Sequence, residues 1–402
     1  ALFSHRVDDP AGLADVLAQG FARFSAGRPG PVHIEIPLDV MGLPALESAD
    51  PVAAQPPPPP QDTARMKEVA VKAHLAKTPL ILAGGGARHA GEALRELAER
   101  LDAPVVTTVN VRGLMHRHPL AVHASPSLKA VRTLIREADL VIAVGTEFGP
   151  TDYDMYADGG FVLPRHLVRI DIDMDQLARH PVAIPLKGDA AELVDALVAE
   201  LGDDRTDRGT GAARAVAARD SAWAEIGPVM RDQVRAVEAM RDALPGSMIV
   251  GDSTQPVYAA NLCYDHDRPG GWFNAATGYG ALGYAPPAAI GAAIARSDLP
   301  VVCLVGDGGF QFTLPEIAVA AETGAAVIFV VWNNRGYREI ETSMRDAGVE
   351  PVGVSPDPPD FLKLADAYGI PAERIASPSG LAAALLRARA AGGPRLVEIV
   401  VD

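Results

Sequence analysis

Two apolar runs towards the end of the chain give the clearest prediction of its fold. The first, Val301–Val305, is rich in β-branched residues and ends at the sequence GDGG (306–309). A helical segment with Pro315 near its start follows, and a second apolar run, Val327–Trp332, ends at two asparagines. Two such strands joined by a helix run parallel and bring their carboxyl ends to the same edge of the sheet. We therefore expect an α/β unit whose two polar turns lie side by side.

The same alternation of apolar strands with amphipathic helices continues through most of the chain. It predicts an α/β protein with doubly wound parallel sheets, one in a central domain and one in a C-terminal domain. The strands expected upstream are 80–83, 105–109, 140–144, 167–172 and 248–250, and the helices include 62–77, 91–101 and one long helix over 212–241. Two more helices and a closing strand are expected over 359–402.

Two breaks in this pattern divide the chain into three segments. Five consecutive prolines (56–60) predict an extended linker, and a charged, glycine-rich stretch (202–211) predicts a second one. The expected segments are residues 1–47, a central α/β domain at 48–205 and a C-terminal domain at 206–402. The first segment offers one amphipathic helix and one strand, which cannot bury the face of a sheet by themselves.

Composition and charge exclude several classes of protein. The net charge of −15 disfavours a surface that binds nucleic acid or an anionic membrane. No apolar run approaches the roughly 20 residues that span a bilayer, so we expect no membrane segment. Only two cysteines occur, and one of them, Cys303, lies inside an expected apolar strand. This usage speaks against a disulfide framework and favours a reducing cytoplasm.

Polar groups at the two strand ends suit a divalent cation bound together with a diphosphate. Asp307 supplies a carboxylate, Asn334 supplies an amide oxygen, and Gly308 and Gly309 supply backbone N–H groups that can face phosphate oxygens. Hard oxygen ligands of this kind suit Mg²⁺, which keeps part of its shell for waters or for the phosphates of a ligand. A glycine turn and an asparagine turn of an ordinary α/β protein would explain each half separately, but not both at this spacing.

The separation of Asp307 and Asn334 by 27 positions resembles the signature of the thiamine-diphosphate (ThDP) enzymes, in particular the acetolactate synthase and 2-oxo acid decarboxylase group. The resemblance implies ThDP and Mg²⁺ as cofactors, with Asp307, the Asn334 side chain and the Gly336 carbonyl as protein ligands of Mg²⁺. It also implies loss of CO₂ from a 2-oxo acid, followed by protonation or carboligation of what remains. The resemblance covers nearly the whole chain and is strongest over residues 248–345.

A glycine-rich stretch upstream resembles a second element of that family. In the sequence GYGALG (278–283), Leu282 takes the place of the large apolar residue that wedges beneath ThDP and bends it. The carbonyl of Gly280 takes the place that accepts a hydrogen bond from the 4′-amino group of the cofactor. The resemblance therefore assigns Leu282 and Gly280 to catalysis as well as to cofactor binding, with plain core packing of Leu282 as the alternative.

Two further groups of residues are assigned to cofactor binding by their place in the family pattern. The turn formed by Asp252, Ser253 and Thr254 follows an expected strand and would lie beside the diphosphate, although helix capping explains it nearly as well. The stretch after the second asparagine covers the diphosphate in that family and begins a helix at the mouth of the active site. Tyr337 and Ile340 belong to this stretch.

Acidic residues in the same stretch suggest a class of substrate. Simple pyruvate decarboxylases carry a catalytic glutamate where this chain has Ile340, and the chain also lacks the tryptophan that acetolactate synthases place three residues later. Glu339 and Glu341 flank Ile340, and two acids facing the tail of a substrate would favour a cationic one, such as a guanidino 2-oxo acid. A solvated helix face, with Arg338 and Arg345 as partners, is the alternative.

The start of the chain departs from the family pattern. The sequence GRPGPVHIEIPLDV (27–40) resembles the closing strand of the pyrimidine-binding domain, so residues 1–47 are expected to be the end of such a domain. The glutamate that activates the cofactor belongs to the part that would lie upstream, and Glu35 is not at its position. We expect the 402-residue chain alone to bind Mg-ThDP weakly and to turn over poorly or not at all. The resemblance also implies a homodimer or tetramer with its sites between chains.

Other functions are kept as alternatives. A NAD-dependent dehydrogenase would need a G-x-G-x-x-G fingerprint, but the sequence GGGARH (84–89) has His89 at the last position, and no acid follows the next strand. Residues 145–148 only loosely resemble the pattern with which related synthases bind FAD, so a central domain without a ligand is favoured over a flavin. A non-catalytic assembly or regulatory subunit built on the same fold is the remaining alternative.

Overall fold

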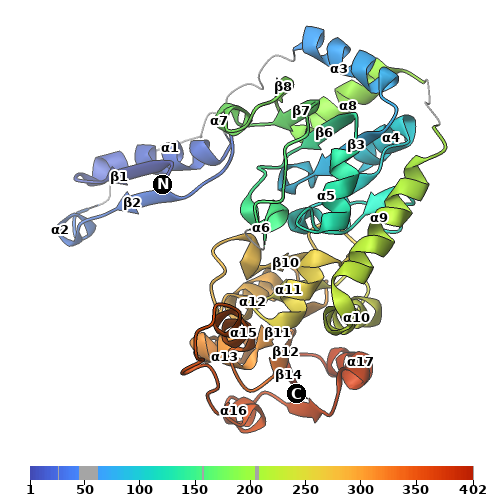
Figure 1. The fold of residues 1–402 in the computed structure, drawn as a ribbon. Helices are drawn as coiled ribbons and strands as arrows, with labels where there is room; N and C mark the ends of the chain where they lie inside the picture. Colours follow the sequence, from blue (N-terminus) through green and yellow to red (C-terminus); the bar gives the residue numbers. More distant parts are fainter. Residues whose placement is uncertain (26, 45–61, 156–157, 204–207, 402) are drawn as a thin grey trace.

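The computed structural model describes residues 1–25, 27–44, 62–155, 158–203 and 208–401, and it places them in three parts along the chain (Figure 1). A small N-terminal arm carries a two-stranded sheet, and each of the two larger parts carries a six-stranded sheet. Every strand pair in the two large sheets is parallel. The predicted fold class, α/β with doubly wound parallel sheets, is therefore confirmed.

The central sheet has the strand order β5-β4-β3-β6-β7-β8. Its strands are β3 (Pro79–Ala83), β4 (Val105–Thr107), β5 (Ala121–Val122), β6 (Leu140–Val144), β7 (Leu167–Asp171) and β8 (Ile184–Lys187). One face is covered by α3 (Thr63–Leu75), α4 (Gly91–Leu101) and α8 (Ala190–Leu201), and the other by α5 (Lys129–Arg136) and α9 (Gly211–Glu225). The short helices α6 (Pro150–Tyr153) and α7 (Met174–Ala178) follow β6 and β7. Because both faces are covered, the two central strands, β3 and β6, are apolar throughout, whereas β7 also carries the buried residues Arg169 and Asp171.

The C-terminal sheet has the strand order β10-β9-β11-β12-β14-β13. Its strands are β9 (Met248–Gly251), β10 (Trp272–Asn274), β11 (Val301–Gly306), β12 (Val327–Asn333), β13 (Ala372–Ile375) and β14 (Arg395–Val400). One face is covered by α10 (Gly227–Ala243), α11 (Gln255–Leu262) and α17 (Leu381–Ala391). The other is covered by α12 (Ala285–Ala295), α13 (Asp307–Phe312), α14 (Ile317–Thr323) and α16 (Phe361–Ala367). A further helix, α15 (Arg338–Asp346), follows β12.

The two apolar runs that dominate the sequence form neighbouring strands at the centre of this sheet. β11 pairs with β12 in parallel, with Gly306 opposite Trp332, and every residue of β12 is buried. Parallel strands that are covered on both faces need apolar side chains throughout, which is why these runs do not alternate. The register places the turn after β11 beside the turn after β12, as predicted.

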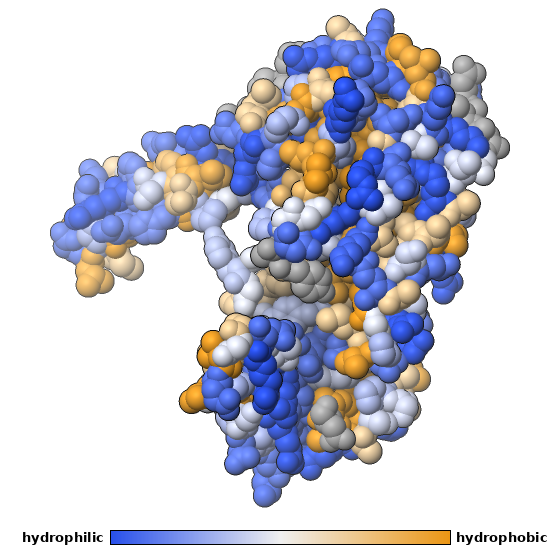
Figure 2. All heavy atoms as spheres, viewed as in Figure 1, coloured by the Kyte–Doolittle hydropathy of each residue, from blue (hydrophilic) through white to orange (hydrophobic). Residues whose placement is uncertain are grey.

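The N-terminal arm contains one strand more than the sequence predicts. β1 (Phe3–Arg6) pairs in parallel with β2 (Val32–Glu35), and α1 (Leu13–Ser25) connects them. The prediction of a single strand was wrong because the sequence FSHR holds one large apolar residue and shows no period. After β2 comes the short helix α2 (Leu38–Met41), and Leu38 is 88% exposed. Figure 2 shows several apolar patches on the surface of this arm.

The single long helix predicted over 212–241 is broken in two. α9 ends at Glu225 and α10 begins at Gly227, whose φ is +75°. Pro228 then occupies the first turn of α10. Glycine at positive φ ends a helix without strain, and proline is tolerated at the start of one, so the sequence GP marks the break. The prediction was wrong because apolar residues recur with a helical period on both sides of it.

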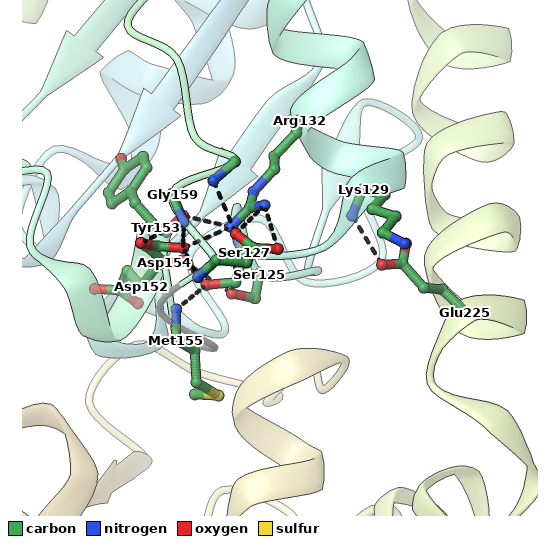
Figure 3. Close-up of polar contacts among 12 residues, drawn as sticks. Ser125, Ser127, Lys129, Arg132, Asp152, Tyr153, Asp154, Met155, Gly159 and Glu225 are labelled. Atoms are coloured by element: carbon green, nitrogen blue, oxygen red, sulfur yellow. Dashed lines mark hydrogen bonds and ion pairs between the residues drawn. The ribbon is translucent and has the colours of Figure 1, made fainter. Parts of the chain in front are cut away.

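Helix α9 packs on the central sheet, although it follows the boundary predicted at 205/206. The carboxylate of Glu225 accepts hydrogen bonds from the backbone N–H groups of Lys129 and Ala130, at 2.8 and 3.1 Å, and so caps the start of α5 (Figure 3). Helix α10 packs instead on α11 and α17 of the C-terminal sheet. The pair α9–α10 therefore spans the seam between the two large parts, and the domain limits stay a prediction.

A cluster of polar contacts holds the segment that follows β6. The hydroxyls of Ser125 and Ser127 both donate to the carbonyl oxygen of Asp152, at 2.9 and 3.0 Å. Arg132, which projects from α5, pairs with Asp154 at 3.1 Å (Figure 3). The segment after β6 is thus tied to α5 and to the loop before it by bonds within the protein.

The remaining expectations from the sequence concern linkers and cysteines. The polyproline linker predicted at 56–60 and the boundary at 47/48 lie outside the described residues, and the linker predicted at 202–211 is described only in part. Cys263 and Cys303 are both buried and form no disulfide. Within the part of the chain that the structure describes, no helix has the length and apolarity needed to cross a bilayer.

Candidate functional site

A cavity of about 210 Å³ lies at the carboxyl ends of β9, β11 and β12. β9 and β11 are neighbours, but the chain leaves them in opposite directions, because β10 lies beyond β9 and β12 lies beyond β11. This is the place where the strand order reverses. Open parallel sheets bind their ligands in the crevice outside the strands at such a point.

The cavity brings together all but one of the residues assigned to the site from the sequence. They are Ser253, Thr254, Gly280, Leu282, Asp307, Gly308, Gly309, Asn334, Gly336, Tyr337 and Ile340. Gln255 and Tyr258 also line the cavity and were missed. They lie three positions apart on α11, directly after the polar turn, so helical spacing from Thr254 onward was the available signal.

Three oxygen atoms converge on one wall of the cavity. Asn334 Oδ1 lies 2.8 Å from the carbonyl oxygen of Gly336 and 3.2 Å from Asp307 Oδ1. All three are acceptors, and without a hydrogen or a cation between them they repel one another. Neighbouring ligands of an octahedral Mg²⁺ ion stand about 3 Å apart, since Mg–O bonds measure about 2.0–2.1 Å. The two distances from Asn334 Oδ1 therefore fit neighbouring ligands in the inner shell of Mg²⁺.

The amide of Asn334 shows why a cation is the simpler explanation of this arrangement. Its Nδ2 donates to Gln255 Oε1 at 2.9 Å. If the amide were turned over, its nitrogen would face Asp307 and Gly336, but its oxygen would then lie 2.9 Å from Gln255 Oε1. Without a cation, these atoms all find hydrogen-bond partners only if the amides of both Asn334 and Gln255 are reversed. A single cation beside the three oxygens stabilises the present orientation of both amides.

Glycines let the backbone come close to the cavity at its two polar turns. A Cβ on Gly308 would lie 2.5 Å from Cε1 of Tyr337, and one on Gly336 would lie 2.6 Å from the carbonyl oxygen of Val354. Gly336 also has a φ of +156°, and its N–H donates to Asp307 Oδ2 at 3.0 Å. A larger residue at Gly308 would displace the ring of Tyr337, which lines the cavity, and one at Gly336 would displace the segment at Val354.

Asp252 is the predicted residue that does not line the cavity. It is fully buried at the end of β9, beneath the floor of the site. Its carboxylate accepts hydrogen bonds from the N–H groups of Ser253, Gly283 and Ala285 at 2.8, 3.2 and 3.0 Å. Thr254 stands at the N-cap of α11, but its side chain makes no capping bond, so the alternative of simple helix capping does not hold for it.

The loop that carries Leu282 and Gly280 faces the polar turns across the cavity. Gly280 has a φ of +67°, and its carbonyl oxygen accepts a hydrogen bond from Ser253 Oγ at 3.1 Å. The carbonyl of Gly283 accepts from Thr313 Oγ1 at 2.8 Å. Leu282 points at the cavity and is only partly buried, which plain core packing would not predict.

Helix α15 forms the mouth of the cavity. Glu339 and Glu341, the two acids predicted to face the tail of a substrate, have different surroundings. Glu341 pairs with Arg338 and Arg345, each at 2.7 Å, and these hydrogen bonds hold the pKa of its carboxyl below the usual range, with Arg345 the larger influence. The helix-face alternative is thus correct for Glu341. Glu339 lines the cavity, is exposed and forms no ion pair with a described residue. Ile340 also lines it and is 48% exposed.

The buried carboxylates of the site lack cationic partners. Burial raises the pKa of Asp307 and of Asp252, and the surrounding backbone N–H groups offset this only in part. Neither carboxylate forms an ion pair with a described Lys, Arg or His side chain. A buried anion without a counter-ion is unfavourable, so a divalent cation beside Asp307 would stabilise the site. Among the described residues, no cluster of three or more His, Cys, Asp or Glu side chains suits a metal ion.

In the corresponding crevice of the central sheet, the backbones of the two turns come close together. A Cβ on Gly84 would lie 2.5 Å from the carbonyl oxygen of Gly145, and one on Gly86 would lie 2.8 Å from Cα of Gly145. Gly84 and Gly86 therefore permit close contact between the turns after β3 and β6, where a dinucleotide fingerprint would instead face pyrophosphate. This packing gives Gly84 and Gly86 a structural reason, and a central domain without a ligand stays a prediction.

Two family models match the chain. One, described as "Thiamine pyrophosphate enzyme, central domain", matches residues 67–197, and the other, "Thiamine pyrophosphate enzyme, C-terminal TPP binding domain", matches residues 252–399. Thiamine pyrophosphate is another name for ThDP. The second match contains both polar turns of the cavity, whereas the arm before residue 62 lies outside both matches.

Curated relatives and solved structures agree with these matches. The chain is 37% identical over 91% of its length to a probable 2-ketoarginine decarboxylase of Pseudomonas aeruginosa, of which it covers 66%. It is 29% identical over 99% of its length to a probable acetolactate synthase large subunit of Methanocaldococcus jannaschii, of which it covers 71%. The chain thus spans about two thirds of the length of these relatives. A putative thiamin diphosphate-dependent enzyme of Mycobacterium smegmatis has the same fold, with a TM-score of 0.79 at 24% identity over 99% of this chain and 75% of that one.

Proposed function

This chain belongs to the thiamine pyrophosphate enzymes, whose central and C-terminal domains it carries, and we propose that it serves the ThDP- and Mg²⁺-dependent decarboxylation of a 2-oxo acid. The observation that carries the proposal is that Asp307 Oδ1 and the Gly336 carbonyl oxygen both lie within 3.2 Å of Asn334 Oδ1. Family membership speaks against the dehydrogenase considered above. A flavin finds no support in these comparisons.

The proposal gives each group of cavity residues a task. The three converging oxygens would hold Mg²⁺, and the N–H groups of Gly308 and Gly309 with the hydroxyl of Thr254 would face the diphosphate. When bound, ThDP supplies a carbon nucleophile and an electron sink for the loss of CO₂. The Gly280 carbonyl would accept a hydrogen bond from the amino group of the cofactor, and Leu282 would pack against its rings.

Tyr337 and Ile340 line the cavity at its mouth. Tyr337 packs over Gly308 and limits access of water to the polar turn, because its ring occupies the space that a Cβ on Gly308 would need. Ile340 lines the outer part of the cavity and would contact substrate or cofactor rather than transfer a proton. Among the described residues, the acids that line the cavity are Asp307 and Glu339, so we propose that the carboxylate that activates the pyrimidine ring comes from a pyrimidine-binding domain.

We propose that a pyrimidine-binding domain, in a homodimer or tetramer, covers this mouth. Tyr279, Phe312 and Ile340 lie near the cavity with exposed fractions of 102, 61 and 48%. Large apolar side chains left open together in this way are typical of a surface that a protein partner covers. Since both cysteines are buried and unpaired, a reducing cytoplasm remains the proposed location.

For the substrate we propose a guanidino 2-oxo acid. Glu339 is the acid that supports this choice, because it lines the cavity and has no basic partner among the described residues, whereas Glu341 is engaged by two arginines. A relative at 37% identity is described as a probable 2-ketoarginine decarboxylase, and 2-ketoarginine is such a compound. A charge-assisted bond between Glu339 and the guanidinium would discriminate against neutral tails.

The choice of substrate can be tested with a pair of substrates that differ only in charge. With the pyrimidine-binding domain supplied, the guanidino 2-oxo acid should be decarboxylated with a higher kcat/KM than its neutral ureido analogue. Glu339→Gln should lower that preference about 10-fold, since a charged hydrogen bond is worth about 1.5–3 kcal/mol. Glu341→Gln is the matched control and should keep the preference. An unchanged preference in Glu339→Gln would exclude Glu339 as the determinant.

The function itself is tested by binding first and by turnover second. Calorimetric titration should show saturable ThDP binding with Mg²⁺ and none with excess chelator. Addition of a pyrimidine-binding domain should then produce CO₂ from a 2-oxo acid. Binding without any CO₂ release would favour the non-catalytic subunit. A flat titration in the presence of that domain would exclude both the decarboxylase and a non-catalytic subunit that binds ThDP.

A further inference from the structure

Asp252 is the buried carboxylate that the proposed function leaves without a task. It lies at the end of β9 with an exposed fraction of 0%, and it does not reach the cavity. All of its hydrogen bonds come from backbone N–H groups. Oδ1 accepts from Ser253 at 2.8 Å and from Gly283 at 3.2 Å, and Oδ2 accepts from Ala285 at 3.0 Å.

These bonds join two segments that are distant in the sequence. Ser253 belongs to the turn after β9, whereas Gly283 and Ala285 lie at the end of the loop that carries Gly280 and Leu282. The turn makes a second tie to the same loop, because Ser253 Oγ donates to the Gly280 carbonyl at 3.1 Å. The loop is therefore held at both ends by one dipeptide.

The carboxylate also touches the third segment of the site. A Cβ on Gly309 would lie 2.8 Å from Asp252 Oδ1, so the start of α13 rests directly on this oxygen. Asp252 thus contacts the turn after β9, the loop before α12 and the first turn of α13. Few groups could replace it, because a carboxylate accepts several N–H bonds, whereas an amide turns an NH₂ group towards donors that it cannot satisfy.

We propose that Asp252 is a positioning residue that fixes Gly280 and Leu282 for the reaction, with Ser253 as its helper, instead of binding the diphosphate as predicted from the sequence. The inference rests on the proposed function, since it assigns Asp252 a part in placing the pyrimidine end of the cofactor. A carbonyl and a wedge that must orient reacting groups lose their effect with small displacements.

The first test is Asp252→Asn, assayed as the chain together with its pyrimidine-binding domain. We expect kcat to fall about 10- to 100-fold, because a displacement of ~1 Å can lower a rate 100-fold. The affinity for ThDP and Mg²⁺ should change less than about 3-fold, since the three metal-facing oxygens remain in place. Equal losses in affinity and in kcat would overturn the proposal, as would an unchanged kcat.

A second readout does not depend on turnover. In the cofactor-free chain, hydrogen exchange of the Gly283 and Ala285 amides should become faster in Asp252→Asn, whereas amides of β11 should keep their protection. Unchanged exchange at both amides would refute the proposed tie. If the unsubstituted protein released no CO₂, the proposed function would fail, yet exchange would still report whether Asp252 holds the loop.

Two variants separate positioning from a general loss of stability. Asp139 in the central domain also accepts backbone bonds, from Lys77 and Thr78 at 2.6 and 2.9 Å, and Asp139→Asn should reduce stability without lowering kcat. Ser253→Ala removes one hydroxyl at a partly exposed site and should fold even where Asp252→Asn does not. It should lower kcat about 3- to 10-fold, in line with the loss of one hydrogen bond, with ThDP affinity nearly unchanged. A fall in kcat with Asp139→Asn, or none with Ser253→Ala, would count against the proposal.

Discussion

Each of the two six-stranded sheets of this protein contains a point at which the strand order reverses, but the turns at that point differ between the sheets. In each, the chain leaves two neighbouring strands in opposite directions, β3 and β6 in the central sheet and β9 and β11 in the C-terminal one. In the central sheet the turns after these strands touch, because Gly84, Gly86 and Gly145 bring backbone against backbone. In the C-terminal sheet they stand apart and enclose a cavity of about 210 Å³.

The difference lies in a few residues at the strand ends and not in the topology. The central turns place Gly84 and Gly86 against the backbone of Gly145, with the side chain of Thr146 packed beside Gly84. The C-terminal turns place Asp307, Asn334 and the Gly336 carbonyl around one point, with glycines only where the backbone must come close. The comparison shows that a doubly wound sheet offers a place for a ligand, and that the side chains at its strand ends decide whether one can bind.

The largest effect should come from removing the carboxylate that distinguishes the C-terminal crevice. Asp307→Ala should reduce the Mg²⁺-dependent affinity for ThDP by at least ~100-fold, because even outer partners of a metal site are worth 10- to 100-fold. Asp173→Ala, at the corresponding end of the central sheet, is the control. Asp173 caps α7 through the N–H of Asp175 at 2.8 Å, so its loss should reduce stability and leave ThDP affinity unchanged. Calorimetric titration of both variants measures these affinities. An equal loss of ThDP affinity in the two variants would contradict the difference between the two crevices.

A matched pair of glycine substitutions, one at each of the two crevices, should have an intermediate effect. In Gly86→Ala the new Cβ would meet the backbone of Gly145 at 2.8 Å, and we expect a loss of about 1–3 kcal/mol in stability with ThDP affinity unchanged. In Gly308→Ala the new Cβ would meet the ring of Tyr337 at 2.5 Å. Because a side chain can swing aside, stability should fall less, while the displaced ring lowers ThDP affinity. Thermal unfolding and titration of both variants check this, and the opposite assignment of the two effects would contradict it.

The last prediction concerns acid, to which the central part should respond through His123. Burial lowers the pKa of His123 to about 4, nearby Arg112 and Arg219 add to the shift, and Asp265 opposes it. The unfolded chain takes up a proton near pH 6.5, well above the folded one, so this group's contribution to stability is present above that pH and is lost as the pH falls towards 4. Urea midpoints measured from pH 7 to 4 should therefore fall less steeply in His123→Gln. His5→Gln, on the exposed strand β1, should keep the slope of the unsubstituted chain.

Much of the fold followed from local patterns. The inner strands and most helices were predicted within a few residues, because strands buried on both faces require apolar runs and covering helices require a regular apolar stripe. The short strands β10 and β13, of three and four residues, and the arm strand β1 are too short to show a period. The break at Gly227 was missed because periodicity alone does not report a backbone turn.

For the site, sequence alone determined which residues are present and how they are spaced. Asp307 and Asn334 were predicted to lie together because the ends of adjacent parallel strands must meet, whatever the details of packing, and Gly336 was added by the family resemblance. Only the tertiary structure decided the direction of each side chain: Asp252 turns beneath the floor, and Glu341 turns to two arginines while Glu339 remains at the cavity. The physical reason is that a side chain's direction depends on the partners that distant segments bring to it, and spacing along the chain does not contain them.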